Sequence, residues 1–366
     1  MKILMLNYEF PPLGGGAANA TYYLLKEFSK FKDLNIDLVT SSTEKYKIEQ
    51  FSNNIKIHYL DINKKGNIHF QSSKDLLTYS WKARKYCKDL IKKSQYDLCH
   101  AFFGIPCGYI AMKLGLPYIV SLRGSDVPFH NPKFKTLDKL FFRRLSMKVW
   151  KRSMSVIANS EDLKNSALKT NPDQKIGVIS NGINIEEFKP SFKDAKKDKI
   201  TMISTGRITK VKGFDYAIEG LKDLKDVELK LVGDGNLITE LQDLSRKLNV
   251  KTTFTGIVPH NEIATHLKEA DIFISSSLNE GMSNSLLEAM ACGLPIIATD
   301  TGGSKELIKN NGFVIKKESS NEIKNAIEKY IKNRDLISLH SKNSRKIAEN
   351  LSWKIVAQKY HQEYKK

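Results

Sequence analysis

The sequence has no long hydrophobic run and few cysteines, and both shortages narrow what the chain can be. No stretch approaches the roughly 18 apolar residues of a membrane-spanning helix, so we expect no such segment. The four cysteines stand singly, without a C-x-x-C pair or a His/Cys spacing typical of zinc, which predicts buried, reduced thiols. The opening residues, MKILMLNYEFPPLGGG, carry Asn7 and Glu9 and do not fit a secretory signal, so we expect a cytoplasmic protein.

The composition indicates a folded protein with a large positive charge. Hydrophobic residues make up 41% of the 366 residues, which is enough for two cores and too many for a disordered chain. Lys and Arg number 59 against 40 Asp and Glu, a formal charge of +19. That excess predicts an anionic partner, which leaves nucleic acid, a membrane surface and a phosphorylated ligand open.

Short apolar runs alternate with amphipathic helical patterns along the whole chain, which favours α/β domains with parallel sheets covered on both faces. Helical periodicity is clear at Asn19–Phe31 and Lys74–Lys93. The predicted strands are Ile3–Leu6, Ile36–Thr40, Ile55–Leu60, Leu98–Phe102, Tyr118–Leu122, Val156–Ala158, Gly177–Ile179, Thr201–Ser204, Glu228–Val232, Thr252–Thr255, Ile272–Ser275, Pro295–Ala298 and Phe313–Ile315.

A polar, Pro-punctuated stretch, FKPSFKDAKKDK, interrupts this alternation. It predicts a first domain over residues 1–188, a linker at 189–198 and a second domain over 199–350, each a doubly wound, Rossmann-like sheet. Ligands bind such sheets at the carboxyl ends of the strands, so we expect the two domains to face each other across a cleft. A last amphipathic helix is predicted over 353–366, with Ser352 as its N-cap.

Three glycine- or cation-containing loops follow predicted strands and suit an anionic ligand. Glycines let backbone approach a ligand closely, a helix N-terminus favours negative charge, and guanidinium and ammonium groups bind phosphate. Each loop also has a plain alternative as a tight turn or as solvated surface cations. The residues concerned are Gly15 and Gly16 in PPLGGGAANATYYLL, Arg207 and Lys212 in STGRITKVKGFD, and Gly233 and Gly235 in KLVGDGNL.

A fourth stretch, LNEGMSNSLLEAMACGLPIIATD, contains two carboxylates eight positions apart, Glu280 and Glu288. Ser283, Asn284 and Ser285 are N-cap candidates for a helix whose first N–H groups could bind phosphate. Glu288 would lie about one turn inside that helix, where a carboxylate can accept hydrogen bonds from two vicinal hydroxyls. The alternative for Glu288 is a charge on an exposed helix face.

Taken together, these pieces resemble family 4 glycosyltransferases of the GT-B fold. The block Glu280-x7-Glu288 with GLPIIATDTGG, the segment GRITKVKG, SNGIN at 180–184, GDG at 233–235 and the N-terminal glycine loop all occur in that family's order, over nearly the whole chain. The resemblance implies an enzyme, a hexosyltransferase that moves a sugar with retention of configuration. The donor would be a nucleotide-diphosphate sugar, expected to be a UDP-sugar, and the acceptor a saccharide or lipid-linked hydroxyl in cell-surface polysaccharide or lipopolysaccharide biosynthesis. It also implies that the final helix packs back onto the first domain.

The same resemblance assigns roles to individual residues. Glu288 would bind the ribose, Arg207 and Lys212 the diphosphate, and Glu280 the sugar. The chain has no D-x-D motif, so neither a metal nor another cofactor is expected, and the two cations would replace a metal ion. The donor-binding set is Gly15, Gly16, Asn181, Arg207, Lys212, Gly233, Gly235, Ser283, Asn284, Ser285, Leu286 and Glu288, and the catalytic set is Arg207, Lys212, Glu280 and Asp126.

One segment departs from the family pattern. Where members often carry His in HG-x-D, this chain reads SLRGSDVP, with Arg123 in the His position and Asp126 retained. Arg123 cannot act as a base, so a contact with the acceptor or the sugar is the role left to it. Asp126 would orient Arg123 or the acceptor hydroxyl. The alternative is a structural ion pair between the two.

A basic amphipathic helix is predicted over 133–152, KFKTLDKLFFRRLSMKVWKR, with eight Lys or Arg and one acid. Such a helix with interleaved aromatic residues is typical of binding to an anionic membrane surface, which predicts a peripheral enzyme at the inner face of the cell membrane. The alternative is an ordinary helix packed by its apolar stripe. The interleaved apolar residues are Phe134, Leu137, Phe141, Leu145 and Trp150.

Two other functions stay open. A sugar-nucleotide 2-epimerase of the same fold would use the same nucleotide pocket and need no acceptor. A nucleic-acid-binding protein would explain the charge, but the sequence contains no recognisable nucleic-acid module, so we expect no nucleic-acid partner.

Overall fold

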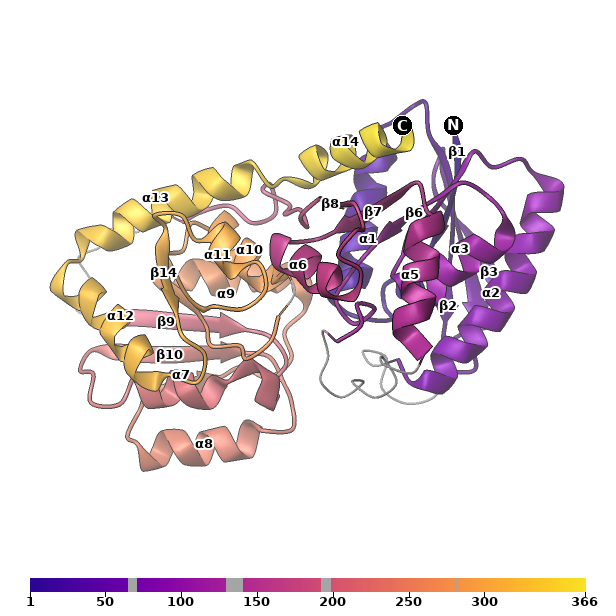
Figure 1. Ribbon diagram of the computed structural model, residues 1–366. Coiled ribbons are helices and arrows are strands. Elements are labelled where there is room, and N and C mark those ends of the chain that lie inside the picture. The colour runs from indigo at the N-terminus through magenta and orange to yellow at the C-terminus, as the bar shows by residue number, and fades with distance from the viewer. Residues whose placement is uncertain (65–70, 130–140, 192–198, 281) are drawn as a thin grey trace. The chain divides into compact units, whose positions relative to one another are not determined.

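The computed structural model describes residues 1–64, 71–129, 141–191, 199–280 and 282–366. They divide into two compact units, one formed by Met1–Asn181 with Trp353–Lys366 and the other by Gly182–Ser352 (Figure 1). The chain enters the second unit earlier than the predicted boundary at 188, and Phe188 is buried in that unit's core. Most of the predicted linker, 192–198, lies outside the described residues.

The first unit is an eight-stranded sheet with helices packed on it. Its strand order is β3-β4-β2-β1-β5-β6-β7-β8, and every neighbouring pair is parallel except β3 with β4. The strands are β1 (Lys2–Leu6), β2 (Asn35–Ser42), β3 (Lys47–Ser52), β4 (Ile55–Asp61), β5 (Leu98–Phe102), β6 (Tyr118–Ser121), β7 (Ser155–Ala158) and β8 (Ile176–Val178). The helices are α1 (Gly16–Phe28), α2 (Ser73–Lys93), α3 (Tyr109–Leu114), α5 (Arg143–Arg152), α6 (Glu161–Thr170) and α14 (Trp353–Tyr364), with a π-helical turn at Gly104–Gly108.

The second unit is a six-stranded sheet of order β11-β10-β9-β12-β13-β14, parallel throughout. The strands are β9 (Ile200–Thr205), β10 (Val227–Val232), β11 (Thr252–Phe254), β12 (Ile272–Ser275), β13 (Ile296–Thr299) and β14 (Gly312–Ile315). The helices are α7 (Phe214–Gly220), α8 (Ile238–Lys247), α9 (Ile263–Glu269), α10 (Asn284–Ala291), α11 (Ser304–Leu307), α12 (Ser320–Lys332) and α13 (Asp335–Glu349), with 3-10 turns at Lys210–Lys212 and His260–Glu262.

Strand β3 is absent from the sequence prediction. Its residues, KIEQFS, are mostly polar, and the first four are exposed at the edge of the first sheet, where the strand runs antiparallel. Its Phe51 packs partly against the core. Hydrophobic pattern identifies strands through their buried faces, so an exposed edge strand gives no such signal.

The last helix, α14, packs beside α1 in the first unit (Figure 1). The Trp353 ring stacks on Tyr23 with ring centroids 6.0 Å apart. The Tyr364 hydroxyl lies 2.7 Å from Nδ1 of His100, a fully buried side chain whose Nε2 lies 2.8 Å from the hydroxyl of Ser121. Burial and the charge of Arg123 lower the pKa of His100, so its imidazole is neutral. The contacts of His100 with Tyr364 and Ser121 are therefore hydrogen bonds between neutral, buried groups.

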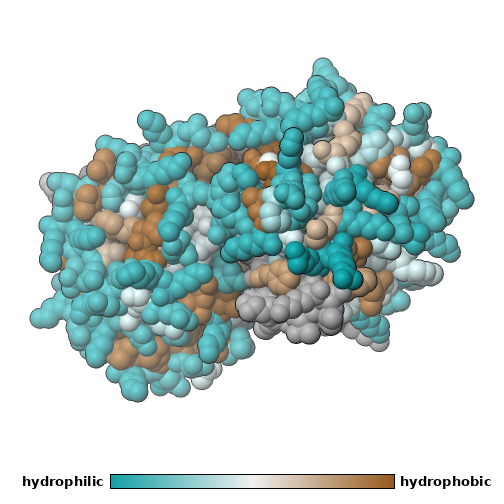
Figure 2. Space-filling view, viewed as in Figure 1, coloured by the Kyte–Doolittle hydropathy of each residue, from teal (hydrophilic) through white to brown (hydrophobic). Residues whose placement is uncertain are grey.

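All four cysteines are buried and unpaired, as predicted. No helix among the described residues is long and apolar enough to cross a membrane. Figure 2 shows hydrophilic side chains over most of the visible face of each unit, with hydrophobic side chains in separate patches.

Candidate active site

The strand order of the second sheet marks one position for a ligand. Counted along the chain, it is the order 3-2-1-4-5-6, which reverses direction between β9 and β12. In such sheets ligands bind beyond the carboxyl ends of the two strands at this reversal. Loop 206–213 follows β9, and the described residues 276–280 and 282–283 follow β12, so these residues form the candidate site of the second unit.

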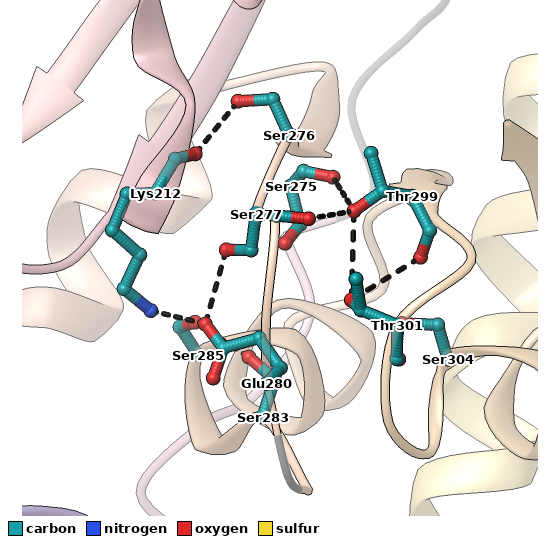
Figure 3. A network of polar contacts seen from close by, with 10 residues as sticks. All are labelled: Lys212, Ser275, Ser276, Ser277, Glu280, Ser283, Ser285, Thr299, Thr301 and Ser304. Atoms are coloured by element: carbon teal, nitrogen blue, oxygen red, sulfur yellow. Dashed lines mark hydrogen bonds and ion pairs between the residues drawn. The ribbon is translucent and has the colours of Figure 1, made fainter. Parts of the chain in front are cut away.

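The structure brings Lys212 and Glu280 together at this position (Figure 3). The Lys212 ammonium pairs with Oε1 of Glu280, and the Ser277 hydroxyl donates to the same oxygen at 3.0 Å. The two charged side chains are 23% and 17% exposed, so their charges are screened less than those of a surface pair. An ammonium has three donors, and this one can therefore hold Glu280 and still bind an anion.

Two hydrogen bonds fix the turn that carries Lys212. The Ser276 hydroxyl donates to the carbonyl of Lys212 at 3.1 Å, and the N–H of Leu278 donates to the carbonyl of Val211 at 2.8 Å. The Lys212 side chain also lies across Gly206, where an added Cβ would come 3.3 Å from its Cε. The loops after β9 and β12 therefore hold the ammonium in a defined place before any ligand arrives.

Helix α10 begins beside this pair and carries the predicted N-terminal residues. Ser283 is its N-cap, but the serine hydroxyl lies 3.0 Å from the hydroxyl of Ser285 and does not cap a backbone N–H. The first-turn N–H groups of a helix have no acceptor within it, and the helix dipole makes them attractive to an anion. Asn284 is the first helical residue, whereas Leu286 is fully buried, so a ligand can reach Leu286 only at its backbone.

Glu288 lies about one turn inside α10 and contacts His260, which the sequence did not single out. Nε2 of His260 lies 3.1 Å from Oε1 of Glu288, and Nδ1 lies 3.8 Å from a carboxylate oxygen of Glu187. The hydrogen bond to Glu288 raises the pKa of His260 against the opposing effect of burial, and the charges of Glu288 and Glu187 add to the rise. His260 is one of eight histidines in the chain and belongs to no motif, so no sequence signal marks it.

Arg207 follows β9 in the same loop, and its side chain is exposed. Within the described parts of the chain it forms no salt bridge, so the structure does not bring it into the contact between Lys212 and Glu280. An exposed guanidinium without a fixed partner can rotate toward a phosphate when one binds.

Gly233 and Gly235 have a packing reason to be glycine. An added Cβ on Gly233 would come 2.0 Å from the carbonyl oxygen of Gly206, and one on Gly235 would come 2.1 Å from that of Ile208. These glycines thus let the loop after β10 lie against the loop after β9. That requirement exists whether or not the two residues also contact a donor.

Two glycine substitutions should show that glycine is required for packing at position 233 but not at position 15. Gly233→Ala should lower the free energy of unfolding by about 2–4 kcal/mol, because it adds a clash to a backbone at φ +141. Gly15→Ala should lower stability by less than Gly233→Ala, since a Cβ there meets no atom within 4 Å and only the backbone at φ −144 and ψ −124 disfavours alanine. Urea denaturation of both variants measures this, and equal loss of stability in the two would contradict it.

In the first unit, Asp126 is buried and bonded to backbone. Its carboxylate accepts from the N–H groups of Gly104 at 2.6 Å, Arg123 at 2.9 Å and Gly124 at 3.0 Å. Burial raises the pKa of this carboxyl, and the backbone donors act in the opposite direction. The contact between Asp126 and Arg123 therefore runs through the arginine backbone, not through a side-chain ion pair, and it shapes the loop after β6.

The Arg123 guanidinium contacts Phe102 and Asn181 rather than the Asp126 carboxylate. It lies 4.6 Å over the Phe102 ring, and its Nη1 donates to Oδ1 of Asn181 at 2.8 Å. Its buried Nε has no hydrogen-bond partner among the described residues. The predicted sites Arg123, Asp126 and Asn181 thus belong to one cluster in the first unit.

The N-terminal glycine loop begins α1, with Gly15 as N-cap and Gly16 as the first helical residue. Gly14 has φ +94, and a Cβ there would meet the Glu9 carboxylate at 2.6 Å, so it is Gly14 that the turn requires. Gly15 is exposed, and its N–H donates to Oε2 of Glu9 at 3.4 Å. The open space at Gly15 leaves its backbone accessible to a ligand.

Two family models and several known proteins match the chain. The model described as "Glycosyltransferase Family 4" matches residues 14–187, and the one described as "Glycosyl transferases group 1" matches 185–350. An uncharacterized glycosyltransferase of Methanocaldococcus jannaschii is 28% identical over 96% of this chain and 95% of its own length. The UDP-Gal:alpha-D-GlcNAc-diphosphoundecaprenol alpha-1,3-galactosyltransferase of Escherichia coli is 29% identical over 70% of this chain and 71% of its own.

Solved structures share the fold over the full chain. Sucrose-phosphate synthase from Thermosynechococcus elongatus has a TM-score of 0.84 at 19% identity. The match covers 100% of this chain and 98% of the synthase chain. HepE of Anabaena in complex with UDP-glucose has a TM-score of 0.72 at 20% identity, with 100% of this chain and 99% of its own covered. At such identities the likeness shows the fold alone, which confirms the predicted GT-B architecture of two Rossmann-like sheets.

Proposed function

Because the chain belongs to glycosyltransferase family 4, we propose that this transferase moves a sugar from a UDP-sugar to a hydroxyl of a saccharide or lipid-linked acceptor, with retention of configuration and without a metal ion. The observation that carries the proposal is the Lys212–Glu280 pair at the sheet reversal of the second unit, beside the start of α10. One solved neighbour is a complex with UDP-glucose, and one relative is named for a UDP-Gal donor and a diphosphoundecaprenol-linked acceptor.

The chemistry explains why these residue types suit the site. The bond between sugar carbon C1 and the diphosphate oxygen breaks, and its electron pair remains on the departing UDP. The acceptor oxygen bonds to C1 from the same face, and its proton passes to the diphosphate oxygen that has just been released. Lys212, Arg207 and the first N–H groups of α10 would stabilise the negative charge on the leaving group.

The two glutamates would hold the two ends of the donor. Glu288 would accept hydrogen bonds from the ribose hydroxyls, and the contact of His260 with one carboxylate oxygen would fix its orientation. Glu280, held by Lys212 and Ser277, would contact the sugar hydroxyls. Lys212 would then touch the diphosphate and Glu280 together, which links recognition of the sugar to stabilisation of the leaving group.

A donor panel tests the proposed function. The full chain is incubated with UDP-, GDP- and ADP-sugars, with and without a panel of saccharide acceptors, and both free nucleotide and new glycosides are measured. We expect UDP release that increases with a suitable acceptor and a product of unchanged anomeric configuration. Epimerised nucleotide-sugar formed without acceptor would instead identify a 2-epimerase, and an inverted product would overturn retention.

The His260–Glu288 contact predicts a pH dependence of stability. The folded-state pKa of His260 is raised above 6.5, so the contribution of the protonated imidazole is fully present below about pH 6.5 and is lost as pH rises through the raised value. His260→Gln should therefore lower the melting temperature most at acidic pH, with the difference from wild type shrinking toward alkaline pH. Glu288→Gln should remove the same dependence, and a pH-independent difference for both variants would contradict the assignment.

We further propose that α5 lies against an anionic membrane surface. Of the predicted helix 133–152, residues 133–140 lie outside the described part of the chain. In the described part, Phe141 is 60% exposed, and Lys148, Lys151 and Arg152 are exposed. Of the interleaved apolar residues, Trp150 is fully buried in the core of the first unit and is therefore not available to a membrane.

Charge reversal on α5 tests this proposal. Replacing Lys148, Lys151 and Arg152 with Glu should weaken binding to phosphatidylglycerol vesicles by at least about a hundredfold, since each cation near such a surface contributes about 1 kcal/mol. Vesicle flotation measures binding. The matched control reverses three exposed lysines of α2, Lys88, Lys92 and Lys93. Equal loss in the control, or no flotation of wild type, would overturn the proposal.

A further inference from the structure

The first unit has a surface pocket, and none of the candidate site residues described above lines it. Its volume is about 430 Å³, within the range of roughly 300–1,000 Å³ that is typical of small-molecule sites. It lies between the segment that joins β2 to β3, the end of β4 and one face of α2. The lining residues are Lys45, Tyr46, Leu60, Asp61, Trp81, Lys82, Lys85, Tyr86 and Asp89.

Large aromatic side chains in this pocket face water. Trp81 is 66% exposed and Tyr46 is 49% exposed, which is unusual for residues of this size. The rings of Tyr46 and Tyr86 are 5.5 Å apart, and the Lys85 ammonium lies 6.0 Å from the centre of the Trp81 ring. The walls therefore combine flat apolar faces with charged groups at their edges.

A chain of hydrogen bonds anchors the aromatic wall to the interior of the sheet. The hydroxyls of Tyr46 and Tyr86 are 2.6 Å apart, and the Tyr86 hydroxyl lies 2.8 Å from Nδ1 of the buried His58. Nε2 of His58 lies 3.0 Å from Oδ1 of Asp37, whose other oxygen accepts from Tyr96 at 2.6 Å. Burial opposes the ionisation of Asp37, but these hydrogen bonds and the nearby positive charges lower its pKa to about 2. The anchored phenols are thus ordered without a ligand.

We propose that this pocket binds a neutral sugar unit of the acceptor, at a distance from the reacting hydroxyl; this inference rests on the proposed glycosyl transfer. A sugar ring has an apolar face that suits Trp81 and Tyr46, and hydroxyls that both donate and accept. The rim offers both kinds of partner, because Lys45 and Lys85 donate and Asp61 and Asp89 accept.

The lining disfavours other ligand classes. Three lysines and two aspartates line the pocket, so their charges nearly cancel and give a strongly charged group little net attraction. An apolar chain would leave these charged groups without partners. The position also suits a long acceptor. The end of β4 lies at the same edge of the sheet as the loop of Arg123 after β6, four strand spacings away, or about 19 Å. A glycan of several sugar units could span that distance.

Tryptophan fluorescence offers a direct test, because Trp81 is the exposed one of the three tryptophans; Trp150 and Trp353 are 0% and 6% exposed. Acrylamide quenching is measured on the full chain without donor, with methyl glucoside, methyl galactoside, methyl mannoside and their trisaccharides as probes. UDP and phosphatidylglycerol vesicles form separate arms. We expect at least one neutral saccharide to protect Trp81 saturably, and no protection by UDP or vesicles.

Variants assign the protection to the pocket. Trp81→Phe should abolish the protected signal, and Tyr46→Ala should weaken saccharide binding about three- to tenfold. Leu77→Ala is the matched control, because Leu77 is 71% exposed on the same helix but does not line the pocket. Protection by none of the saccharides, or protection by vesicles instead, would overturn the inference. The quenching assay measures binding and needs no turnover. A failure of the proposed transfer would instead be seen in the donor panel, where the wild-type protein would form no product from any donor.

Discussion

Lys212→Ala should lower the rate constant of sugar transfer by about a hundred- to a thousandfold, the usual cost of removing one donor that stabilises developing negative charge. The ammonium is fixed by its turn and by Glu280, and it stands at the sheet reversal where a diphosphate would lie. Its loss would remove a preorganised positive charge from beside the proposed leaving group. The measurement is steady-state release of UDP with a donor and an acceptor from the panel.

The control for this variant lies two residues away. Lys210 belongs to the same 3-10 turn but is exposed, so Lys210→Ala should change the rate little. Circular dichroism and a melting curve establish that Lys212→Ala is folded. A folded Lys212→Ala protein with wild-type activity, or equal losses in both variants, would show that Lys212 does not serve the leaving group.

Glu288→Ala should raise the KM for the donor about ten- to a hundredfold and change kcat much less. A hydrogen bond to a charged group contributes about 1.5–3 kcal/mol, and tenfold in affinity corresponds to 1.4 kcal/mol. Glu288 sits on α10 with only 12% of its side chain exposed, next to His260. Because a ribose bound there would be remote from the breaking bond, losing this proposed contact should weaken binding of the ground state and of the transition state alike.

A nearby glutamate supplies the comparison for Glu288. Glu262 is exposed in the 3-10 turn that begins at His260, so Glu262→Ala should leave the donor KM unchanged. A drop in kcat at unchanged KM for Glu288→Ala would place this carboxylate at the reacting sugar and would reverse the roles given to the two glutamates.

Much of the fold follows from patterns that the sequence displays. Buried parallel strands are short apolar runs, and all the runs predicted as strands overlap strands of the structure. The exceptions have physical causes. β3 is mostly exposed at the sheet edge, and Trp150 points inward because α5 packs its apolar side against the core of the first unit. Helical periodicity indicates that a side chain can be buried, but not which neighbours it meets.

The candidate site shows where such prediction ends. The resemblance to family 4 glycosyltransferases implied that Lys212 and Glu280 lie near one ligand, and the two side chains are in contact. No local pattern could show that His260 reaches Glu288, because these residues are distant in sequence and meet only through tertiary packing. Likewise, the need for glycine at 233 arises from the loop after β9, and the partners of Asp126 are backbone groups that carry no residue-specific signal.

The most direct test of the central claim, that the second unit holds a nucleotide-sugar donor, is a calorimetric titration of the full chain with UDP-glucose, UDP-galactose, GDP-mannose and ADP-glucose in the presence of a chelator. We predict saturable binding of at least one UDP-sugar, with an affinity that added Mg²⁺ does not improve. The claim would be contradicted if none of the four nucleotide-sugars bound, or if binding appeared only when the metal ion was restored.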